Sequence, residues 1–539
     1  MNGVERALVA LLALPVIGLV VQAFGLLSGV SFEGIWLRLL TEPALAEAAI
    51  HSVMLGIATL WLSLKLACLA SFRWLFSSSV SWFRWLILAM PHSALGLGVL
   101  LFFGASGVWV RLATVIWPEI GPFDYLFPRD PLGIGALSVL VLKESLFLSI
   151  LAVPVARQLP CRATYDLGRQ AGLSDVMIYR DLLWPQVLVR LRAPILVVLA
   201  FAVSNLEVAM ILGPDQPQFI SVRILSLLMD PDPLAQSAGA LAALLMLVAL
   251  SVLGMCCSYL TRPKLVDVKE RNYSRYSEFL LPCFSVLIKA MGTAAIFSLF
   301  LWAIAGYWSV EMFMPRVTME SLSRLVPNFS VIFMTLSLGI LVAALSVGLA
   351  VGILEWMVAL RARTLHWIWW GFIWMPALPL SAGFLGWLYL AGGEPGYGPT
   401  LVSHLVLATP YAMIVLAGDW LGRTELERHV LSESGISRMV ALRIIWMPRH
   451  SPQILVAFAI SFSVSCALYT QTLLLGGGRV ETLATELIVN LAGDRRSAAA
   501  AGLWNALLPW LIFGGCTFLG TWFWRSRLGM QGGLDVRVR

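Results

Sequence analysis

Charged residues are scarce in this sequence: Asp, Glu, Lys and Arg make up 12% of its 539 positions. Soluble domains carry about 25%, so the composition excludes an ordinary soluble domain. Hydrophobic residues make up 59% of the chain, and its mean hydropathy is +0.85. Such values are expected of a chain that crosses a membrane many times. We therefore predict an all-α polytopic membrane protein.

The sequence also lacks paired-cysteine signals. Its seven cysteines include no Cys-x-x-Cys spacing, which speaks against a disulfide framework or a zinc site. We predict no metal and no cofactor. The net charge of +7 does not indicate nucleic acid binding, because the arginines fall mainly in short loops between apolar segments. Positive charge in such loops sets the orientation in the membrane.

Twelve apolar segments approach the length of about 20 residues that crosses a hydrocarbon core of about 30 Å. The predicted spans are 7–28, 49–71, 82–104, 132–154, 193–213, 235–260, 284–306, 329–357, 367–391, 401–420, 453–475 and 501–524. The first apolar run is too long for a signal peptide, so we predict a retained helix. Lys and Arg gather in alternate loops, which we predict to be cytoplasmic together with both termini.

The most polar long connection, 261–283, separates six predicted helices from six. We predict an N-terminal repeat at 1–260, a cytoplasmic linker at 261–283 and a C-terminal repeat at 284–539. An even number of helices in each half lets the two halves lie parallel, related by an axis along the membrane normal.

A repeated loop supports this division. Gly, any residue, Ser, five residues, Arg, four residues and Pro occur twice, 263 positions apart (435 minus 172). The matching residues are Gly172, Ser174, Arg180 and Pro185, then Gly435, Ser437, Arg443 and Pro448. The pattern predicts a short helix, a Gly break and a second short helix, with Pro starting the next membrane segment. Such an elbow suits docking into a groove on a soluble partner. The alternative is that Gly, Ser and Pro are ordinary turn residues of a loop.

The register between the two halves is unsettled in the fifth helix. Gly213 and Gly476 keep the spacing of 263 (476 minus 213), but Ala200–Ser204 matches Ala457–Ser461 at a spacing of 257 (457 minus 200).

The two loops resemble the cytoplasmic coupling loop of binding-protein-dependent ABC importer permeases: Glu-Ala-Ala, three residues, Gly, and a Pro thirteen positions later. Asp166-Leu167-Gly168 and His429-Val430-Leu431 occupy the Glu-Ala-Ala positions, and Glu427 or Glu433 could replace the missing carboxylate of the second loop. The segment from Leu475-Gly476-Gly477-Gly478 to the alanines at 498–501 resembles the permeases of thiamine and ferric-iron importers.

The resemblance implies two tandem six-helix repeats of the type I importer permease (MetI-like) fold in a bacterial inner membrane. It implies two copies of a cytoplasmic ATP-binding subunit, one on each loop, and a periplasmic binding protein that delivers a small thiamine-like or ferric-iron-like solute. Outer loops 105–131 and 214–234 are candidate contacts for that protein. No lysine of this chain follows Gly, so it has no phosphate-binding P-loop, and ATP hydrolysis is expected on a separate subunit. We predict no catalytic residue.

Three charged residues fall inside predicted membrane segments. Lys143 and Glu144 either line a pathway or form a structural ion pair, and Glu207 is predicted to line the pathway. A carboxylate there suits a cationic solute. His92 and His404 are predicted to be packed histidines rather than ligands.

A twelve-helix secondary transporter is the main alternative. That class usually carries a Gly-x-x-x-Asp-Arg-like motif after its second helix, and the segment 71–82 contains neither Gly nor Asp.

Overall fold

The computed structural model describes residues 3–75, 82–117, 127–260, 276–309, 312–360, 375–421, 433 and 435–525. Within these residues the regular structure is helical throughout. This agrees with the predicted all-α class, because a chain in lipid has to satisfy its backbone hydrogen bonds internally.

The helices of the first 260 residues are α1 (Gly3–Ala23), α2 (Phe32–Leu40), α3 (Leu45–Leu75), α4 (Trp82–Ala89), α5 (His92–Phe103), α6 (Val108–Ile116), α7 (Ile134–Arg157), α8 (Cys161–Gln170), α9 (Asp175–Met177), α10 (Trp184–Arg190), α11 (Arg192–Ser204), α12 (Glu207–Leu212), α13 (Ile220–Leu228) and α14 (Pro233–Leu260). A π-helical turn, Ile178–Leu183, joins α9 to α10.

The later helices are α15 (Tyr276–Ala303), α16 (Met319–Ser323), α17 (Phe329–Leu360), α19 (Ala377–Leu390), α20 (Tyr397–Leu421), α22 (Arg438–Ala441), α23 (Met447–Arg449), α24 (Ser451–Ala467), α25 (Tyr469–Gly476), α26 (Leu483–Asn490) and α27 (Arg495–Arg525). A second π-helical turn, Leu442–Trp446, joins α22 to α23.

In the described part of the chain, seven helices are long and apolar enough to cross a membrane, or up to nine if each of two bent pairs is one span. Three shorter apolar helices lie within α1, α15 and α19. The described parts of the twelve predicted segments are mostly helical, but 24–28 forms turns after α1 and the span 82–104 is interrupted between α4 and α5. Residues 367–374 lie outside the described residues. These findings support a polytopic membrane protein, and the count of twelve crossings stays a prediction.

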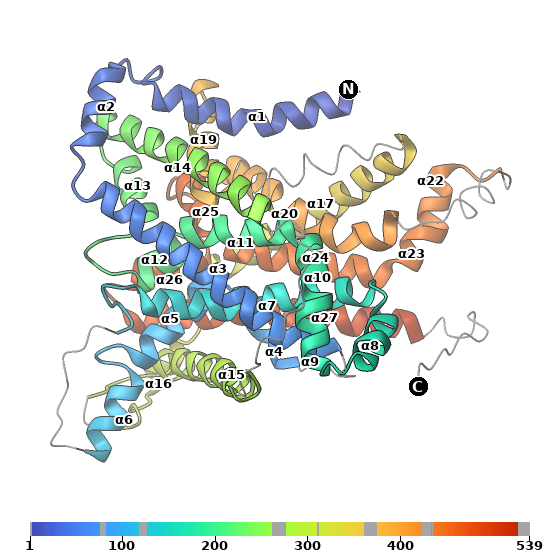
Figure 1. The fold of residues 1–539 in the computed structure, drawn as a ribbon. Coiled ribbons are helices and arrows are strands. Elements are labelled where there is room, and N and C mark those ends of the chain that lie inside the picture. Colours follow the sequence, from blue (N-terminus) through green and yellow to red (C-terminus); the bar gives the residue numbers. More distant parts are fainter. Residues whose placement is uncertain are drawn as a thin grey trace.

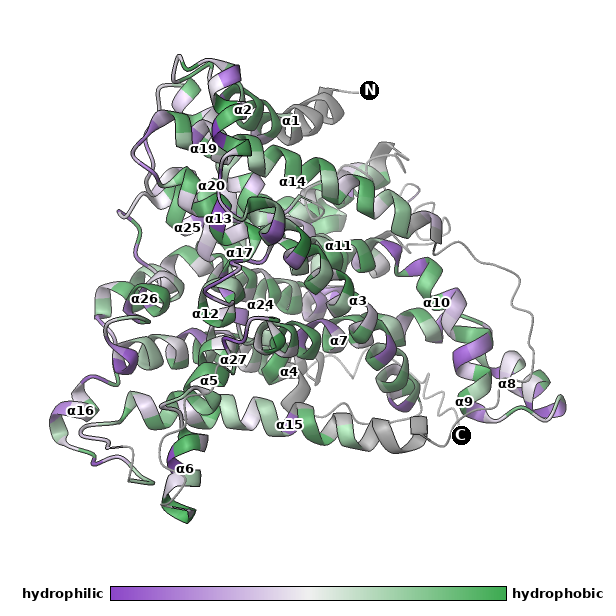
Figure 2. Cartoon of the chain, turned by 60° about the vertical axis from the view of Figure 1, so that its left-hand side comes forward, coloured by the Kyte–Doolittle hydropathy of each residue, from purple (hydrophilic) through white to green (hydrophobic). Residues whose placement is uncertain are grey.

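The long helices form one bundle (Figure 1), with hydrophilic residues concentrated toward its two ends (Figure 2). The first turn of α1, the last turn of α27, α8 and α22 lie at the same end. Helices α2, α13, α16 and α26 lie at the opposite end.

Two helices pack on a part of the chain remote in sequence. Helix α1 contacts α14 and α19, and α15 contacts α27 and α5. Both remote contacts use glycine: a Cβ on Gly383 would lie 2.0 Å from the Pro15 carbonyl oxygen, and one on Gly98 would lie 2.6 Å from that of Ala295. The Ser298 hydroxyl donates to the Gly98 carbonyl oxygen at 2.6 Å. The small residues therefore allow close backbone approach, as in other membrane helix pairs.

Three predictions about local structure need correction. Pro185 and Pro448 do not start the next membrane segments, because each lies in a short helix after a π-helical turn. The chain then bends by 74° before α11 and by 79° before α24. The predicted spans 193–213 and 453–475 are also not continuous, since α11 and α12, and likewise α24 and α25, are separate helices. The last part of the predicted linker, from Tyr276 to Cys283, is helical, and 261–275 lies outside the described residues.

Candidate functional site

The first repeated loop forms a helical elbow at the end of the bundle that holds α8 and α9. Helix α8 ends before Gly172, whose φ of +79° is a left-handed conformation that favours glycine. The Ser174 side chain then accepts the backbone N–H of Met177 at 3.4 Å, as the N-cap of α9. The predicted order of helix, Gly break and helix is present.

The second loop repeats these features where it is described. Gly435 has a φ of +65°, and the Ser437 side chain accepts the backbone N–H of Val440 at 3.4 Å. Arg180 and Arg443 lie in the two π-helical turns, ahead of Pro185 and Pro448. His429 lies outside the described residues, and Glu433 is exposed. The repeated positions of the pattern therefore have matching backbone roles in both loops.

The first elbow has an internal ion pair across its turn. Arg169 donates to the Asp175 carboxylate from Nε at 2.8 Å and from Nη2 at 2.9 Å. This hydrogen bond from Arg169 lowers the pKa of Asp175 below its usual value. At a spacing of 263 the second loop carries Ser432 and Arg438 instead, which cannot form this pair.

One face of α8 packs on the rest of the elbow, and the opposite face is exposed. Tyr165 and Gly168 are buried, and a Cβ on Gly168 would lie 2.5 Å from the Ile178 side chain. Asp166 and Leu167 are exposed, the latter by 67%. The Tyr179 hydroxyl lies 2.7 Å from that of Ser71 on α3, so the elbow is tied to the membrane bundle.

The predicted intramembrane charges lie together in a buried polar cluster, which we define as His92, Lys143, Glu144 and Glu207. His92 Nε2 lies 3.2 Å from Glu144 Oε1, and the Lys143 ammonium donates to the Met90 carbonyl oxygen. Lys143 and Glu144 are 5% and 6% exposed. The two neighbours therefore have different direct partners, and Lys143 satisfies a carbonyl at the break between α4 and α5.

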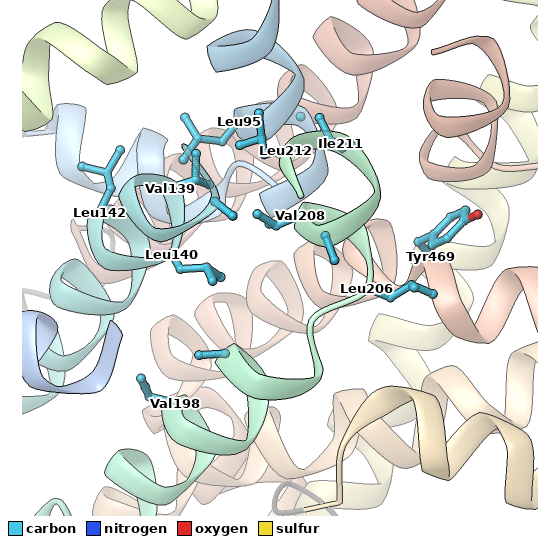
Figure 3. Close-up of a cluster of buried hydrophobic side chains, with 14 of the residues drawn as sticks. Leu95, Val139, Leu140, Leu142, Val198, Leu206, Val208, Ile211, Leu212 and Tyr469 are labelled. Atoms are coloured by element: carbon cyan, nitrogen blue, oxygen red, sulfur yellow. The ribbon is translucent and has the colours of Figure 1, made fainter. Parts of the chain in front are cut away.

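Glu207 joins two parts of the chain that are far apart in sequence. It begins α12, and its carboxylate accepts the backbone N–H of Tyr469, the first residue of α25, at 3.2 Å. Figure 3 shows Leu206 and Tyr469 next to each other where the chain passes from α11 to α12. A carboxylate at the start of a short helix is stabilised, because the unpaired backbone N–H groups of the first turn point toward it.

In the later part of the chain, the buried His404 contacts two hydroxyl groups. His404 Nδ1 lies 2.9 Å from the Ser465 hydroxyl, and His404 Nε2 lies 3.1 Å from the Thr472 hydroxyl. Both predictions of packed histidines, His92 and His404, agree with these contacts. The ionisable groups of the polar cluster come only from the first 260 residues.

A cleft of about 170 Å³ lies between α7, the α10–α11 bend and α20. Its lining residues are Phe147, Leu151, Val155, Arg190, Leu191, Pro194, Val197, Tyr411 and Ile414. Tyr411, which lines the cleft, is within electrostatic range of Glu144 of the polar cluster. The cleft lies beside the bend that follows the first elbow.

Sequence reasoning missed three residues of this region. Asn205 ends α11, and its side-chain oxygen accepts the backbone N–H of Val208 at 2.7 Å. An Asn within an apolar run was the available signal for this break. Tyr469 and Tyr411 carried no such signal, because only the tertiary fold brings them to Glu207 and Glu144.

No protein-family model matches the chain. The chain is 29% identical over 451 residues to the inner membrane ABC transporter permease protein YnjC of Escherichia coli (strain K12). The aligned region covers 83% of this chain and 82% of that protein. Together with the apolar helices, this distant similarity supports a multi-pass inner membrane permease of the ABC transporter class. The name of the relative specifies no cargo, so the thiamine-like or ferric-iron-like solute stays a prediction.

Proposed function

We propose that the chain is the permease subunit of an ATP-driven importer, built as two six-helix repeats that each present one elbow to an ATP-binding subunit. The observation that carries this proposal is the pair of elbows, with a left-handed Gly and a Ser N-cap at the same spacing. Both elbows lie at the end of the bundle where α1 begins and α27 ends (Figure 1). Two matching surfaces on one side suit two copies of one soluble subunit.

Further matched contacts support the two repeats. The Ser52 hydroxyl on α3 accepts the Ile220 N–H at 2.9 Å, and the Thr335 hydroxyl on α17 accepts the Leu483 N–H at 2.9 Å. The remote helix contacts also match. Helix α1 packs on α19 of the second repeat, and α15 packs on α5 of the first repeat. Each repeat would thus place its first helix on the other repeat.

The proposal also accounts for the unsettled register. Leu191 and His450 occupy the two bends and are 259 positions apart (450 minus 191). Asn205 and Leu468 follow the two helices and are 263 apart (468 minus 205). Helix α10 has 7 residues against 3 in α23, whereas α11 has 13 against 17 in α24. These lengths differ as if one helical turn had moved across the bend, which supports the spacing of 263 rather than 257 at the end of the helix.

The solute would pass between the repeats, and Glu207 favours a cation there. Its carboxylate accepts an N–H from the other repeat, so separating the repeats removes that partner. A buried carboxylate without a partner is costly. A cationic group on the solute would replace the lost contact. A periplasmic binding protein would deliver this solute at the end of the bundle opposite the elbows.

The decisive experiment tests the elbows. Gly172→Pro and Gly435→Pro require a φ near −65°, which the left-handed turns do not allow. We expect each variant to fold but to lose the coupling of ATP hydrolysis to uptake in proteoliposomes. Gly392→Pro is the matched control, because Gly392 also has a left-handed φ, of +69°, and open space around it. Its backbone N–H donates to the carbonyl oxygen three positions earlier, as that of Gly172 does.

Full uptake by both elbow variants would contradict the proposal. Uptake driven by a proton gradient without ATP would instead favour the twelve-helix secondary transporter. The assembly itself predicts two ATP-binding subunits for each permease after purification from native membranes. Recovery of the permease with no such subunit under conditions that retain transport would also contradict it.

A further inference from the structure

A long shallow groove runs along the outer face of α15. One part, of about 490 Å³, is lined by Phe102, Val286, Lys289, Ala290, Thr293, Ala294 and Phe297. A second part, of about 310 Å³, is lined by Thr293, Ile296, Phe297 and Phe300. The two parts share Thr293 and Phe297, so they form one continuous surface, which we name the α15 groove.

Among the described residues that line the α15 groove, Lys289 carries the charge. Its side chain is exposed, and among the described residues no carboxylate lies within 4.0 Å of its ammonium group. Val286 and Phe297 beside it are 65% and 40% exposed apolar residues. A lysine in such a setting reaches toward the membrane interface and attracts an anion there.

The dimensions of the α15 groove fit one leaflet. Eleven positions separate Lys289 from Phe300, which is about 16 Å along a helix. Half of a hydrocarbon core of about 30 Å is about 15 Å. The last turn of α15 leads to α16, which lies at the end of the bundle opposite the elbows (Figure 1), so Lys289 is at the end of the groove nearer the elbows.

We propose that the α15 groove binds one anionic phospholipid of the leaflet on the elbow side, with its phosphate at Lys289 and an acyl chain along Thr293, Phe297 and Phe300. Helix α15 is also the helix that reaches across to α5, where Ser298 bonds to the Gly98 carbonyl. The bound lipid therefore covers and stabilises a contact between remote parts of the chain. This inference requires a membrane position for α15 and is independent of the solute.

The test uses the full-length chain purified in micelles that contain equal amounts of phosphatidylglycerol and phosphatidylethanolamine, with retained lipids measured by mass spectrometry. We expect wild-type protein to be enriched in phosphatidylglycerol. Lys289→Gln should lower that enrichment about fivefold, the scale of one lysine at an anionic surface. Thr293→Trp, which fills the groove and keeps the lysine, should also remove it.

Lys65→Gln is the matched control. Lys65 is likewise exposed on a long apolar helix, but its ammonium lies over the Trp61 ring, 3.9 Å from the ring centre. The Lys65→Gln variant should keep the enrichment in phosphatidylglycerol. In a separate control, excess glycerol phosphate should not displace the lipid from the wild-type protein. The proposal is overturned if Lys289→Gln retains the enrichment, if Lys65→Gln loses it equally, or if glycerol phosphate competes. Thermal unfolding of each variant verifies that it is folded.

Discussion

At the scale of single residues, Glu207 allows a direct test of the contact between the broken helices. Glu207→Ala leaves the buried Tyr469 N–H without its acceptor, which costs about 1–3 kcal/mol. Glu207→Gln keeps an acceptor oxygen and should cost less. Thermal unfolding in detergent checks this order. The control is Glu394→Ala, whose exposed pair with Arg479 is worth about 0–1 kcal/mol. Equal stability of Glu207→Ala and wild type would show that the contact contributes nothing.

The Arg169–Asp175 pair gives the first elbow a defined pH dependence. Arg169 lowers the pKa of Asp175 in the folded protein, so the pair contributes fully above the unfolded pKa of about 3.9. The contribution of the pair to stability is lost as the pH falls through the lowered pKa that Asp175 has in the folded protein. Amide hydrogen exchange at residues 173–177, corrected for its intrinsic pH dependence, should be faster in Asp175→Asn than in wild type at pH 7. This difference should shrink only below about pH 4.

Arg162→Gln on the same helix is the control for that measurement, because Arg162 is exposed and takes no part in the pair. It should exchange as wild type does. If protection of these amides from exchange in the wild type already declines near neutral pH, a group other than Asp175 is responsible for it.

Residue roles set by local sequence were predictable, and those set by tertiary contact were not. The breaks at Gly172 and Gly435 were predicted from a short pattern, and the capping bonds of Ser174 and Ser437 are equally local, because turns and caps depend on neighbouring residues. The acceptor role of Glu207 depends on Tyr469, which is 262 positions away. Hydropathy places the carboxylate in the membrane but cannot name its partner.

At the scale of helices, apolar length predicted the positions of the elements but not their breaks. Most residues of α11 and α12 are apolar, so a hydropathy window runs through both helices even though Ser204, Asn205 and Glu207 at the junction are polar. The break coincides with one side chain, Asn205, whose oxygen accepts the Val208 N–H in the first turn of α12. The bends after α10 and α23 were missed because Pro185 and Pro448 were the strongest local signals, although the chain turns a few residues later.

The helix contacts through Gly383 and Gly98 predict a matched pair of destabilised variants. In Gly383→Ala and Gly98→Ala the new methyl group meets backbone atoms 2.0 and 2.6 Å away, so the helices have to separate. Each should lose about 1–3 kcal/mol, the usual cost of overpacking. Gly352→Ala has open space on α17 and should be neutral or slightly stabilised. Unfolding curves in detergent compare the three, and equal curves would contradict the close contact.

At the scale of the whole molecule, the first helix of each proposed repeat is exchanged. Helix α1 packs on α19, and α15 packs on α5, so each proposed repeat completes the surface of the other. The exchange predicts that the two halves hold together without relying on the connection between them. It could not be predicted from hydropathy, because an apolar helix has the same pattern whichever neighbour it contacts.

This exchange predicts that the chain can be divided. Residues 1–260 and 276–539, expressed together as separate polypeptides, should be purified as a one-to-one complex through a tag on either piece, because α1 and α15 anchor each to the other. Removing residues 1–23 from the first piece should weaken the complex, and Gly383→Ala in the second should weaken it in the same direction, since both act on the α1–α19 contact. Gly352→Ala should leave it intact. If the two pieces elute separately, the connection holds the halves together and the exchanged helices do not.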